Sequence, residues 1–477
     1  MRPDIADIVR GADLGGWRPV EIEHGDRTIE VLLPPGAKTL GMREFAPLAR
    51  PAEEIRRSLE DPVGTPPLAK IIGAKGKPAR DLSVCITTSD ITRPVPYKGE
   101  DGILDPLLRI LQDCGVRREN VTLLVGTGTH RPSTAQEKSA MFGERVAAEF
   151  RIIDHVCDDE SMLTNIGRTR SGTEIQINRH FIEADVKIAT GLVESHFMAG
   201  VSAGRKAICP ALVSRKTIER FHSAQFLSSP NATNLVLQGN PCHEESLEIA
   251  RKTGVDFIVN TVLNHRLQLI GVFSGDLEKS HDKAVELVRR VVSIPVDREY
   301  DIVLTHGGYV GINNYQNAKA ACNALPIVRE NGFLVLAACE RDQDPIGPAT
   351  YKTLLHLLKL QGPDGYLAAL LNPAWKFTRD QWEPQMWGKV IGKIGEEGIL
   401  YCTAFIPERE QRRVPGTAGW DFLPDRILAH DVEATQAMVR NALVYAYHHP
   451  KWGGRKPSVA FILEGPYAIP CVQGSPS

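Results

Sequence analysis

The sequence predicts an α/β protein with parallel sheets, arranged in two lobes. From Leu82 onward, short runs rich in β-branched residues alternate with helical segments of ten or more residues, which is the pattern of βαβ units. The same alternation restarts near Val296 after a long helical segment, which indicates a second lobe. A length of 477 residues is enough for roughly two to four folding units with cores of their own.

The first lobe is expected over residues 1–295, as a Rossmann-like domain with a parallel sheet. It opens with a hairpin, because VEIEHGDRTIEVLLP alternates apolar and polar residues around Gly25 and Asp26. A proline-marked linker follows. The later strands are expected at LSVCITT, NVTLLVG, RIIDHV, ADVKIATGLV, DFIVNTVLN and LQLIGVF.

The second lobe is a smaller α/β domain over residues 296–477. Its strands are expected at YDIVLTHGG, NGFLVLAAC, ILYCTAFI and PSVAFILEG, and helices at NNYQNAKAACNAL and DVEATQAMVRNALVYAY. Packing of the final segment, about residues 430–477, back on the first lobe is left open. Ligands of open α/β sheets bind beyond the carboxyl ends of the strands. We therefore expect the active site in the cleft between the lobes.

The charge balance argues against nucleic acid and membranes as partners. There are 56 basic and 58 acidic side chains, which gives a net charge of −2. No apolar run reaches the length of a membrane span, and the first residues lack the apolar core of a signal peptide, so a cytoplasmic location is expected. Nine cysteines without a CxxC pair predict neither a disulfide framework nor a structural zinc site. No pattern indicates an oligomeric state.

Polar residues collect where the predicted strands end. The first strand runs into TTSDITRPVP, which places Asp90, Thr92 and Arg93 in a proline-stiffened turn. The second ends in GTGTHRP, where glycines free the backbone and His130 follows. ADVKIATGLV leads into ESHFMAGVSAGRKAICP, which carries His196. Histidines titrate near neutrality, so both of them suit proton transfer with a substrate.

Several common enzyme motifs are absent from the sequence. SAGRKA lacks the spacing of a Walker A loop, and HExxH does not occur. GTGTH supplies only the first half of the G-x-G-x-x-G fingerprint of dinucleotide-binding proteins. P-loop NTPases are excluded, and zincin-type hydrolases are unsupported. A lyase or dehydrogenase that uses a free nicotinamide nucleotide is a weaker alternative.

The sequence resembles the lactate racemase family, the nickel-pincer-dependent 2-hydroxyacid racemases and epimerases. Five motifs occur in the family's order, over roughly residues 85 to 320: DITRP, GTGTHRP, HFMAGVSAGRK, ERFHS and NNYQNAKA. The resemblance implies a cofactor, the nickel-pincer nucleotide (nickel pyridinium-3,5-bisthiocarboxylic acid mononucleotide), attached covalently through Lys206. It implies His222 as the protein ligand of the nickel. Sulfur- and nickel-insertion enzymes would be maturation partners.

The resemblance also implies the remaining roles, and it makes the first lobe, residues 1–295, the cofactor-binding and catalytic domain. The family's cofactor-contacting turn corresponds to Asp90, Ile91, Thr92 and Arg93. The C2 proton of a 2-hydroxyacid is too weakly acidic for direct removal, so C2 would be inverted by reversible hydride transfer to the cofactor. Two bases would then take the hydroxyl proton, one for each enantiomer: His130 and His196. Substrate binding is expected from Arg93, Gln316 and Lys319.

Three positions depart from the family pattern, at Met198, Val201 and Ala203. An alanine at position 203 would be strained in a loop that requires a positive φ. These departures leave the substrate open between lactate, a sugar acid and a malate-type hydroxyacid. A non-catalytic paralogue that only binds the cofactor is a further alternative, although the two histidines favour an enzyme.

Overall fold

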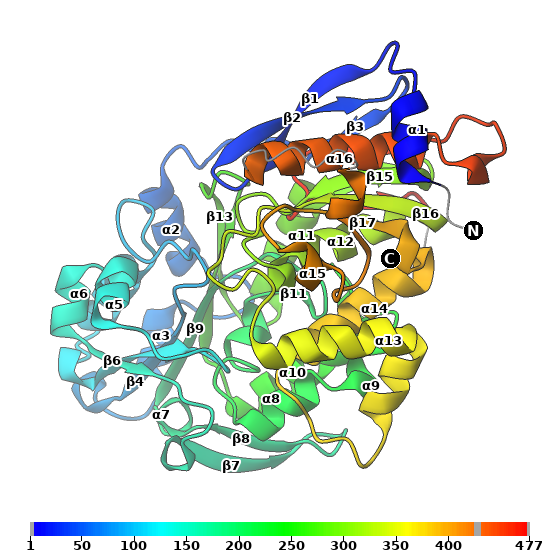
Figure 1. The fold of residues 1–477 in the computed structure, drawn as a ribbon. Helices are drawn as coiled ribbons and strands as arrows, with labels where there is room; N and C mark the ends of the chain where they lie inside the picture. Colours follow the sequence, from blue (N-terminus) through cyan, green and yellow to red (C-terminus); the bar gives the residue numbers. More distant parts are fainter. Residues whose placement is uncertain (1–3, 424–430, 475–477) are drawn as a thin grey trace. The chain divides into compact units, whose positions relative to one another are not determined.

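The computed structural model, shown in Figure 1, describes residues 4–423 and 431–474. The chain forms two compact units. Unit 1 combines the residues up to Arg43 with those from Val292 onward. Unit 2 is the intervening stretch, Glu44–Val291. Each unit contains a six-stranded sheet in which parallel pairs predominate, so the predicted α/β class with parallel sheets is confirmed.

The sheet of unit 2 positions most of the predicted site residues. Its strands, in spatial order, are β13 (Leu269–Gly275), β12 (Phe257–Leu263), β9 (Val186–Leu192), β4 (Val84–Ser89), β5 (Val121–Gly126) and β6 (Arg151–Asp154). All neighbours are parallel except β12 and β13. β4 and β9 are buried almost throughout, as expected for strands covered on both faces. Two short antiparallel pairs, β7 (Leu163–Arg168) with β8 (Glu174–Asn178) and β10 (Ser195–His196) with β11 (Gly200–Val201), complete the strands.

The helices of unit 2 follow from local sequence signals. They are α2 (Pro51–Glu60), α3 (Leu68–Gly73), α4 (Leu104–Asp113), α5 (Ala135–Phe142), α6 (Glu144–Glu149), α7 (Arg179–Ile182), α8 (Arg215–Phe221), α9 (Ala224–Leu227), α10 (Pro241–Thr253) and α11 (Lys279–Val292). α4 buries all four of its leucines, which recur at helical spacing. α10 begins after the capping side chain of Asn240 and ends at Gly254 in the left-handed conformation.

Unit 1 is built on a fully parallel sheet. Its strands, in spatial order, are β18 (Thr417–Ala418), β17 (Ile399–Cys402), β16 (Val328–Ala337), β15 (Tyr300–His306), β19 (Val459–Ile462) and β3 (Lys38–Leu40). A parallel pair, β14 (Ser293–Val296) with β20 (Ile469–Val472), lies outside this sheet. The predicted hairpin is present as β1 (Arg18–His24) and β2 (Arg27–Leu33), joined by Gly25 and Asp26.

The helices of unit 1 are α1 (Ile5–Gly11), α12 (Asn314–Ala324), α13 (Ala349–Leu371), α14 (Trp382–Ile394), α15 (Glu408–Gln411) and α16 (Asp431–Tyr447). α12 and α13 both pack against α14. α16 packs against β2 and β16, and its Leu443 shares a core cluster with Leu33 and Phe461. That cluster joins the beginning of the chain to its end.

The structure groups the first residues differently from the predicted domains, 1–295 and 296–477. Residues before Glu44 lie in unit 1, because β3 pairs with β19 and the β1–β2 hairpin packs against α16. The final segment therefore packs on amino-terminal residues, but within unit 1; residue 430 and residues 475–477 of it lie outside the described part. The strand–helix pattern starts only at Leu82, so no local signal indicates which sheet the earlier strands join.

Candidate active site

Three neighbouring strands of unit 2 end beside one another and are followed by polar side chains. β4 lies between β5 and β9, and all three run in the same direction. Asp90 follows β4 directly, His130 follows β5, and Glu194 follows β9. Asp90 and His130 were predicted from the sequence, and the structure brings them into contact.

Asp90 and His130 form a hydrogen-bonded pair. Oδ2 of Asp90 lies 2.6 Å from Nδ1 of His130, whose side chain is 55% exposed. Oδ1 of Asp90 accepts hydrogen bonds from the amide (3.2 Å) and hydroxyl (2.5 Å) of Thr92. Burial opposes ionisation of Asp90, but the hydrogen bonds from His130 and Thr92 outweigh it, and the pKa of Asp90 is lowered. Asp90 is thus an ionised partner of His130, whereas the neighbouring Ile91 is exposed.

Arg93 is paired with Glu194, a residue that the sequence analysis did not select. Nη1 of Arg93 lies 2.5 Å from Oε2 of Glu194, and both side chains are about one-third exposed. The backbone amide of Glu194 donates a hydrogen bond to the hydroxyl of Ser202 at 2.9 Å. The backbone amide of Ser202 donates to the carbonyl oxygen of Glu194, also at 2.9 Å. This contact links the Asp90–Arg93 turn to the segment that carries His196. An acidic residue before a histidine gives no sequence signal for such a link.

His196 lies on the short β10–β11 hairpin, opposite Gly200. Its Nδ1 accepts hydrogen bonds from the backbone amides of Met198 (3.3 Å) and Ala199 (3.2 Å). Gly200 has φ +80°, and a Cβ there would lie 2.3 Å from the carbonyl oxygen of Val236. Only glycine fits this position, so the hairpin holds His196 in a tightly constrained backbone.

The turn that leads to Lys206 is strained. Ala203 has φ 54° and ψ −156°, a region that is essentially restricted to glycine. The structure therefore confirms the positive φ that makes alanine unfavourable at this position. The next residue, Gly204, also has a positive φ, and a Cβ there would lie 2.6 Å from the ring of His281. The ring of His281 therefore leaves no room for a side chain at position 204.

Arg205 is almost fully buried and ties this turn to the hairpin. Its Nη2 donates to the carbonyl oxygens of Ala199 (2.7 Å) and Val201 (2.9 Å). Val201 is 0% exposed and Met198 is 4% exposed. Both side chains therefore lie in the interior of unit 2.

Lys206 and His222 lie against the same aromatic ring. Nζ of Lys206 lies 5.5 Å from the ring centroid of Phe221, and the ring of His222 meets that of Phe221 edge to face at 4.7 Å. Burial, with the charges of Arg93 and Arg205, lowers the pKa of Lys206 well below its ordinary value. Burial, with the charge of Lys206, lowers the pKa of His222 to about 3. A neutral imidazole is therefore favoured at His222. The sequence analysis did not select Phe221.

The predicted pair Gln316 and Lys319 lies in unit 1, on α12. Nζ of Lys319 donates to Oε1 of Gln316 at 2.6 Å, as their spacing on one helix face predicted. On the same helix, Nδ2 of Asn317 donates to Oε1 of Glu340 (3.3 Å), which also accepts from the hydroxyl of Tyr401. Glu340 is 1% exposed, and burial raises its pKa to about 8. A buried network thus supports the helix that carries the pair.

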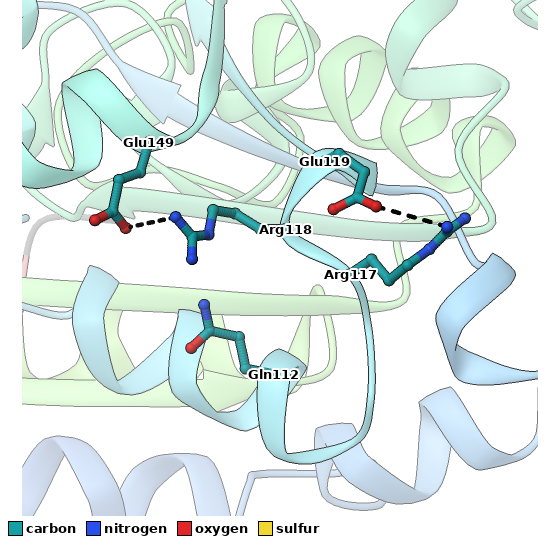
Figure 2. Close-up of a pocket in the computed structure, with 5 residues that line it drawn as sticks. All are labelled: Gln112, Arg117, Arg118, Glu119 and Glu149. Atoms are coloured by element: carbon teal, nitrogen blue, oxygen red, sulfur yellow. Dashed lines mark ion pairs between the residues drawn. The ribbon is translucent and has the colours of Figure 1, made fainter.

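A surface pocket lies at the amino-terminal end of β5, opposite the polar strand ends. Figure 2 shows its lining residues, Gln112, Arg117, Arg118, Glu119 and Glu149. Arg118 pairs with Glu149 at 3.2 Å and Arg117 with Glu119 at 3.6 Å. Because these exposed charges neutralise one another, we do not assign the pocket to the active site.

The part of the chain that the structure describes lacks two kinds of feature. No group of three or more histidine, cysteine or acidic side chains there could hold a metal ion. Among the same residues, no helix is both long and apolar enough to cross a membrane. None of the nine cysteines, all of which lie in the described residues, forms a disulfide bond.

Comparisons with known proteins agree with the resemblance. The family model of the lactate racemase N-terminal domain matches residues 24–234. The lactate racemases of Lactiplantibacillus plantarum and Thermoanaerobacterium thermosaccharolyticum are 34% and 32% identical, each over 71% of this chain and over 77% and 76% of their own lengths. The lactate racemase apoprotein from T. thermosaccharolyticum has a similar structure, with a TM-score of 0.79 and 26% identity over 95% of this chain and 100% of that one. A Thermotoga maritima protein shares the fold, with a TM-score of 0.59 and 18% identity over 90% of this chain and 100% of its own.

The fold and these relatives define an enzyme of the racemase class, and hence an isomerase. The identity and the coverage of the relatives are sufficient to assign the family. The chain belongs to the lactate racemase family.

Proposed function

We propose that this protein inverts C2 of a small 2-hydroxyacid by reversible hydride transfer, with a nickel-pincer nucleotide attached to Lys206. The observation that carries the proposal is the grouping of Lys206, Phe221 and His222 in unit 2. A half-buried amine with a lowered pKa is a nucleophile, which suits covalent attachment. The racemase relatives named above support inversion at C2 as the reaction.

The residues present fit the proposed cofactor. Nδ1 of His222 lies 3.2 Å from the carbonyl oxygen of Ile218, so Nδ1 carries the proton and the lone pair is on Nε2, the nitrogen that can bind a metal. A cofactor that brings its own sulfur and carbon ligands needs only one from the protein. The chemistry that the bound nucleotide supplies is the acceptance and return of the C2 hydride.

The chain's own residues bind the substrate and move its hydroxyl proton. His130, oriented by Asp90, and His196, oriented by the hairpin amides, are the proposed acid–base groups. The guanidinium of Arg93 is proposed to bind the substrate carboxylate, held in place by Glu194. Gln316 and Lys319 on α12 are proposed as further substrate contacts, and Thr92 and Ile91 as cofactor contacts.

The decisive experiment uses protein coexpressed with the sulfur- and nickel-insertion enzymes of cofactor maturation. Intact mass and nickel analysis should show one covalent adduct, and the loaded protein should invert at least one acid in a panel of enantiopure 2-hydroxyacids that includes lactate, malate and sugar acids. Lys206→Ala should abolish the adduct, whereas Lys216→Ala, at an exposed position on α8, should leave it unchanged. An adduct on the Lys206→Ala protein would refute the attachment site.

Loaded protein that inverts nothing in the panel would identify a cofactor-binding protein without racemase activity. Inversion only of malate or of a sugar acid would keep the mechanism and change the substrate. Both outcomes correspond to alternatives that the sequence left open.

The substrate role of Lys319 has its own test. Lys319→Met removes the charge and keeps the length of the side chain. A charge-assisted hydrogen bond contributes about 1.5–3 kcal/mol, so we expect KM to rise by roughly 10- to 100-fold in the loaded enzyme. An unchanged KM would remove Lys319 from the substrate site.

A further inference from the structure

Asn240 is a buried asparagine whose side chain uses every hydrogen-bonding position that it has. Its Oδ1 accepts from the backbone amides of Cys242 (3.0 Å) and His243 (3.3 Å), which caps the start of α10. Its Nδ2 donates to the carbonyl oxygens of Met198 and Val236, both at 3.0 Å. Asn240 is 0% exposed, and its amide has two donor hydrogens and one oxygen with two lone pairs, so the group is completely satisfied.

These four partners fix the orientation of the amide. Backbone N–H groups only donate and carbonyl oxygens only accept, so an exchange of Oδ1 with Nδ2 would place like groups against one another. An aspartate would cap the helix equally well, but when ionised it offers no donor to Met198 and Val236. The helix cap alone therefore does not require an asparagine at this position, whereas the two carbonyl contacts do.

Met198 connects Asn240 with the proposed acid–base group His196. The backbone amide of Met198 donates to Nδ1 of His196 at 3.3 Å, and the carbonyl oxygen of Met198 accepts from Asn240. Ala199 is arranged in the same way, because its amide donates to His196 at 3.2 Å and its carbonyl oxygen accepts from the buried Arg205 at 2.7 Å. Both amides that meet the ring thus belong to residues whose carbonyl groups are held by buried side chains.

The segment that leads to Asn240 supports the same hairpin. The amide of Leu235 donates to the carbonyl oxygen of Gly200 at 2.8 Å, and Arg289 on α11 donates to the carbonyl oxygen of Leu235. Leu235 has φ 61°, a conformation that is costly for a residue other than glycine and persists only where the surroundings impose it. The segment is therefore fixed by its contacts with the hairpin and with α11.

The first turn of α10 also contacts the proposed cofactor site. Sγ of Cys242, two residues after Asn240, donates to the carbonyl oxygen of Phe221 at 3.4 Å. Phe221 is the ring against which Lys206 and His222 lie. The start of α10 thus joins the β10–β11 hairpin to the residues proposed to hold the cofactor, and Asn240 makes the contact with the hairpin.

We infer that Asn240 is a positioning residue for His196, which it holds in place through the carbonyl group of Met198. The inference rests on the proposed function, in which His130 and His196 each take the hydroxyl proton of one enantiomer. Asn240 is completely buried and acts through the hairpin. Its loss displaces His196 and leaves His130 in place, so the reaction of one enantiomer is slowed and that of the other is not.

The first turnover of the loaded enzyme separates the two histidines. The enzyme is mixed with one enantiomer of the acid that it inverts, and the reaction is stopped in acid within one turnover. The 2-keto acid formed by loss of the hydroxyl proton and the C2 hydride is then measured as its phenylhydrazone. His130→Asn and His196→Asn identify the enantiomer that each histidine serves, because each variant should form keto acid from the other enantiomer alone.

Asn240→Asp keeps the helix cap and, when ionised, removes both donors. The enantiomer served by His196 should form keto acid about 10- to 100-fold more slowly, because the acid–base group is displaced, and the other enantiomer should stay within about twofold. Equal slowing of both enantiomers, no slowing, or the pattern of His130→Asn would overturn the inference. Asn240→Ser keeps a capping oxygen on a shorter side chain and should give the same difference; it replaces Asn240→Asp if that protein does not fold.

Asn178→Asp is the matched control. Asn178 is also 0% exposed and caps a helix of unit 2, α7, but its Nδ2 contacts Nδ1 of His155 (3.1 Å) and not the hairpin. Both substitutions should lower the Tm of the apoprotein, whereas only Asn240→Asp should produce a difference between the enantiomers. The same difference in Asn178→Asp would show a general effect of lost stability and would overturn the inference.

Hydrogen exchange of the apoprotein tests the contact without cofactor or activity. The backbone amides of residues 197–201, followed by mass spectrometry, should exchange about tenfold faster in Asn240→Asp than in Asn178→Asp. Equal exchange in the two variants would overturn the inference. The proposed function fails separately, if loaded wild-type protein forms no keto acid from either enantiomer of any acid in the panel.

Discussion

The two sheets of this protein share a parallel architecture but differ in how their carboxyl-terminal edges are finished. In unit 2 the strand ends carry ionised or titratable groups in the pairs Asp90–His130 and Arg93–Glu194, and all of these side chains except Asp90 are partly exposed. In unit 1, His306 ends β15 and Glu340 follows β16, and both are buried, at 0% and 1% exposure. Burial lowers the pKa of His306 to about 4 and raises that of Glu340 to about 8, so both are favoured as neutral groups. The edge of a parallel sheet thus indicates where polar groups gather, and their exposure decides whether they can react.

The largest effect that we expect concerns the strand ends of unit 2. His130→Asn removes the proposed proton acceptor, and kcat of the loaded enzyme should fall by about 10²–10⁴-fold. The adduct mass and the circular dichroism spectrum should be unchanged, since the side chain is half exposed. His356→Asn, on the exposed face of α13, is the control and should keep full activity. Equal losses from both substitutions would contradict the proposed role of His130 as proton acceptor.

The buried groups at the strand ends of unit 1 are tested by the pH dependence of the free energy of unfolding. The pKa of Glu340 is about 8 in the folded protein, above its value in an unfolded chain, so the unfolded state releases this proton first as pH rises. Glu340 therefore stabilises the fold fully below about pH 4 and loses this effect between about pH 4 and 8, at up to about 1.4 kcal/mol per pH unit. Glu340→Gln should flatten the decline of unfolding free energy over this range. Denaturant titrations at pH 5 and 7.5 would measure it, and parallel curves for the two proteins would contradict the buried, neutral state.

A smaller effect concerns backbone strain in unit 2. Ala203→Gly should relieve a conformation that costs about 1–3 kcal/mol, partly offset by the greater chain entropy of glycine, for a net gain of about 1 kcal/mol. Ala199→Gly is the matched control. Ala199 is buried in the neighbouring β10–β11 hairpin and does not have a positive φ. This substitution should destabilise the protein. A lower melting temperature for Ala203→Gly would show that the lost methyl contacts outweigh the strain.

The smallest effect is expected at the surface pocket of Figure 2. Arg118→Gln breaks an exposed ion pair with Glu149, and such pairs contribute at most about 1 kcal/mol. Stability should change by less than about 0.5 kcal/mol, and the activity of the loaded enzyme should not change. A marked loss of activity would show that function reaches the opposite edge of the sheet.

Local patterns predicted the parts of the fold that local interactions determine. The β1–β2 hairpin follows from alternation around a two-residue turn, and the strand-end positions of Asp90 and His130 follow from the βαβ rhythm. The positive φ of Ala203 was anticipated from the glycine usual in the family. Contacts between distant segments left no such signal. Glu194 meets Arg93 across about a hundred residues of sequence, and Phe221 resembles any buried aromatic residue until Lys206 and His222 are seen beside it.

The pairing of β3 with β19 has a consequence for how the protein is made. The two strands are separated by about 420 residues, and in the described sheet β19 is the neighbour that holds β3 in place. At a synthesis rate of about 5–20 residues per second, β3 leaves the ribosome roughly 20 to 80 s before its partner exists. Unit 2, in contrast, is complete once Val291 has been added and can fold during that interval. Unit 2 can therefore fold before synthesis of unit 1 is complete. The amino-terminal strand β3 can take its place in the sheet of unit 1 only after β19 has been synthesised.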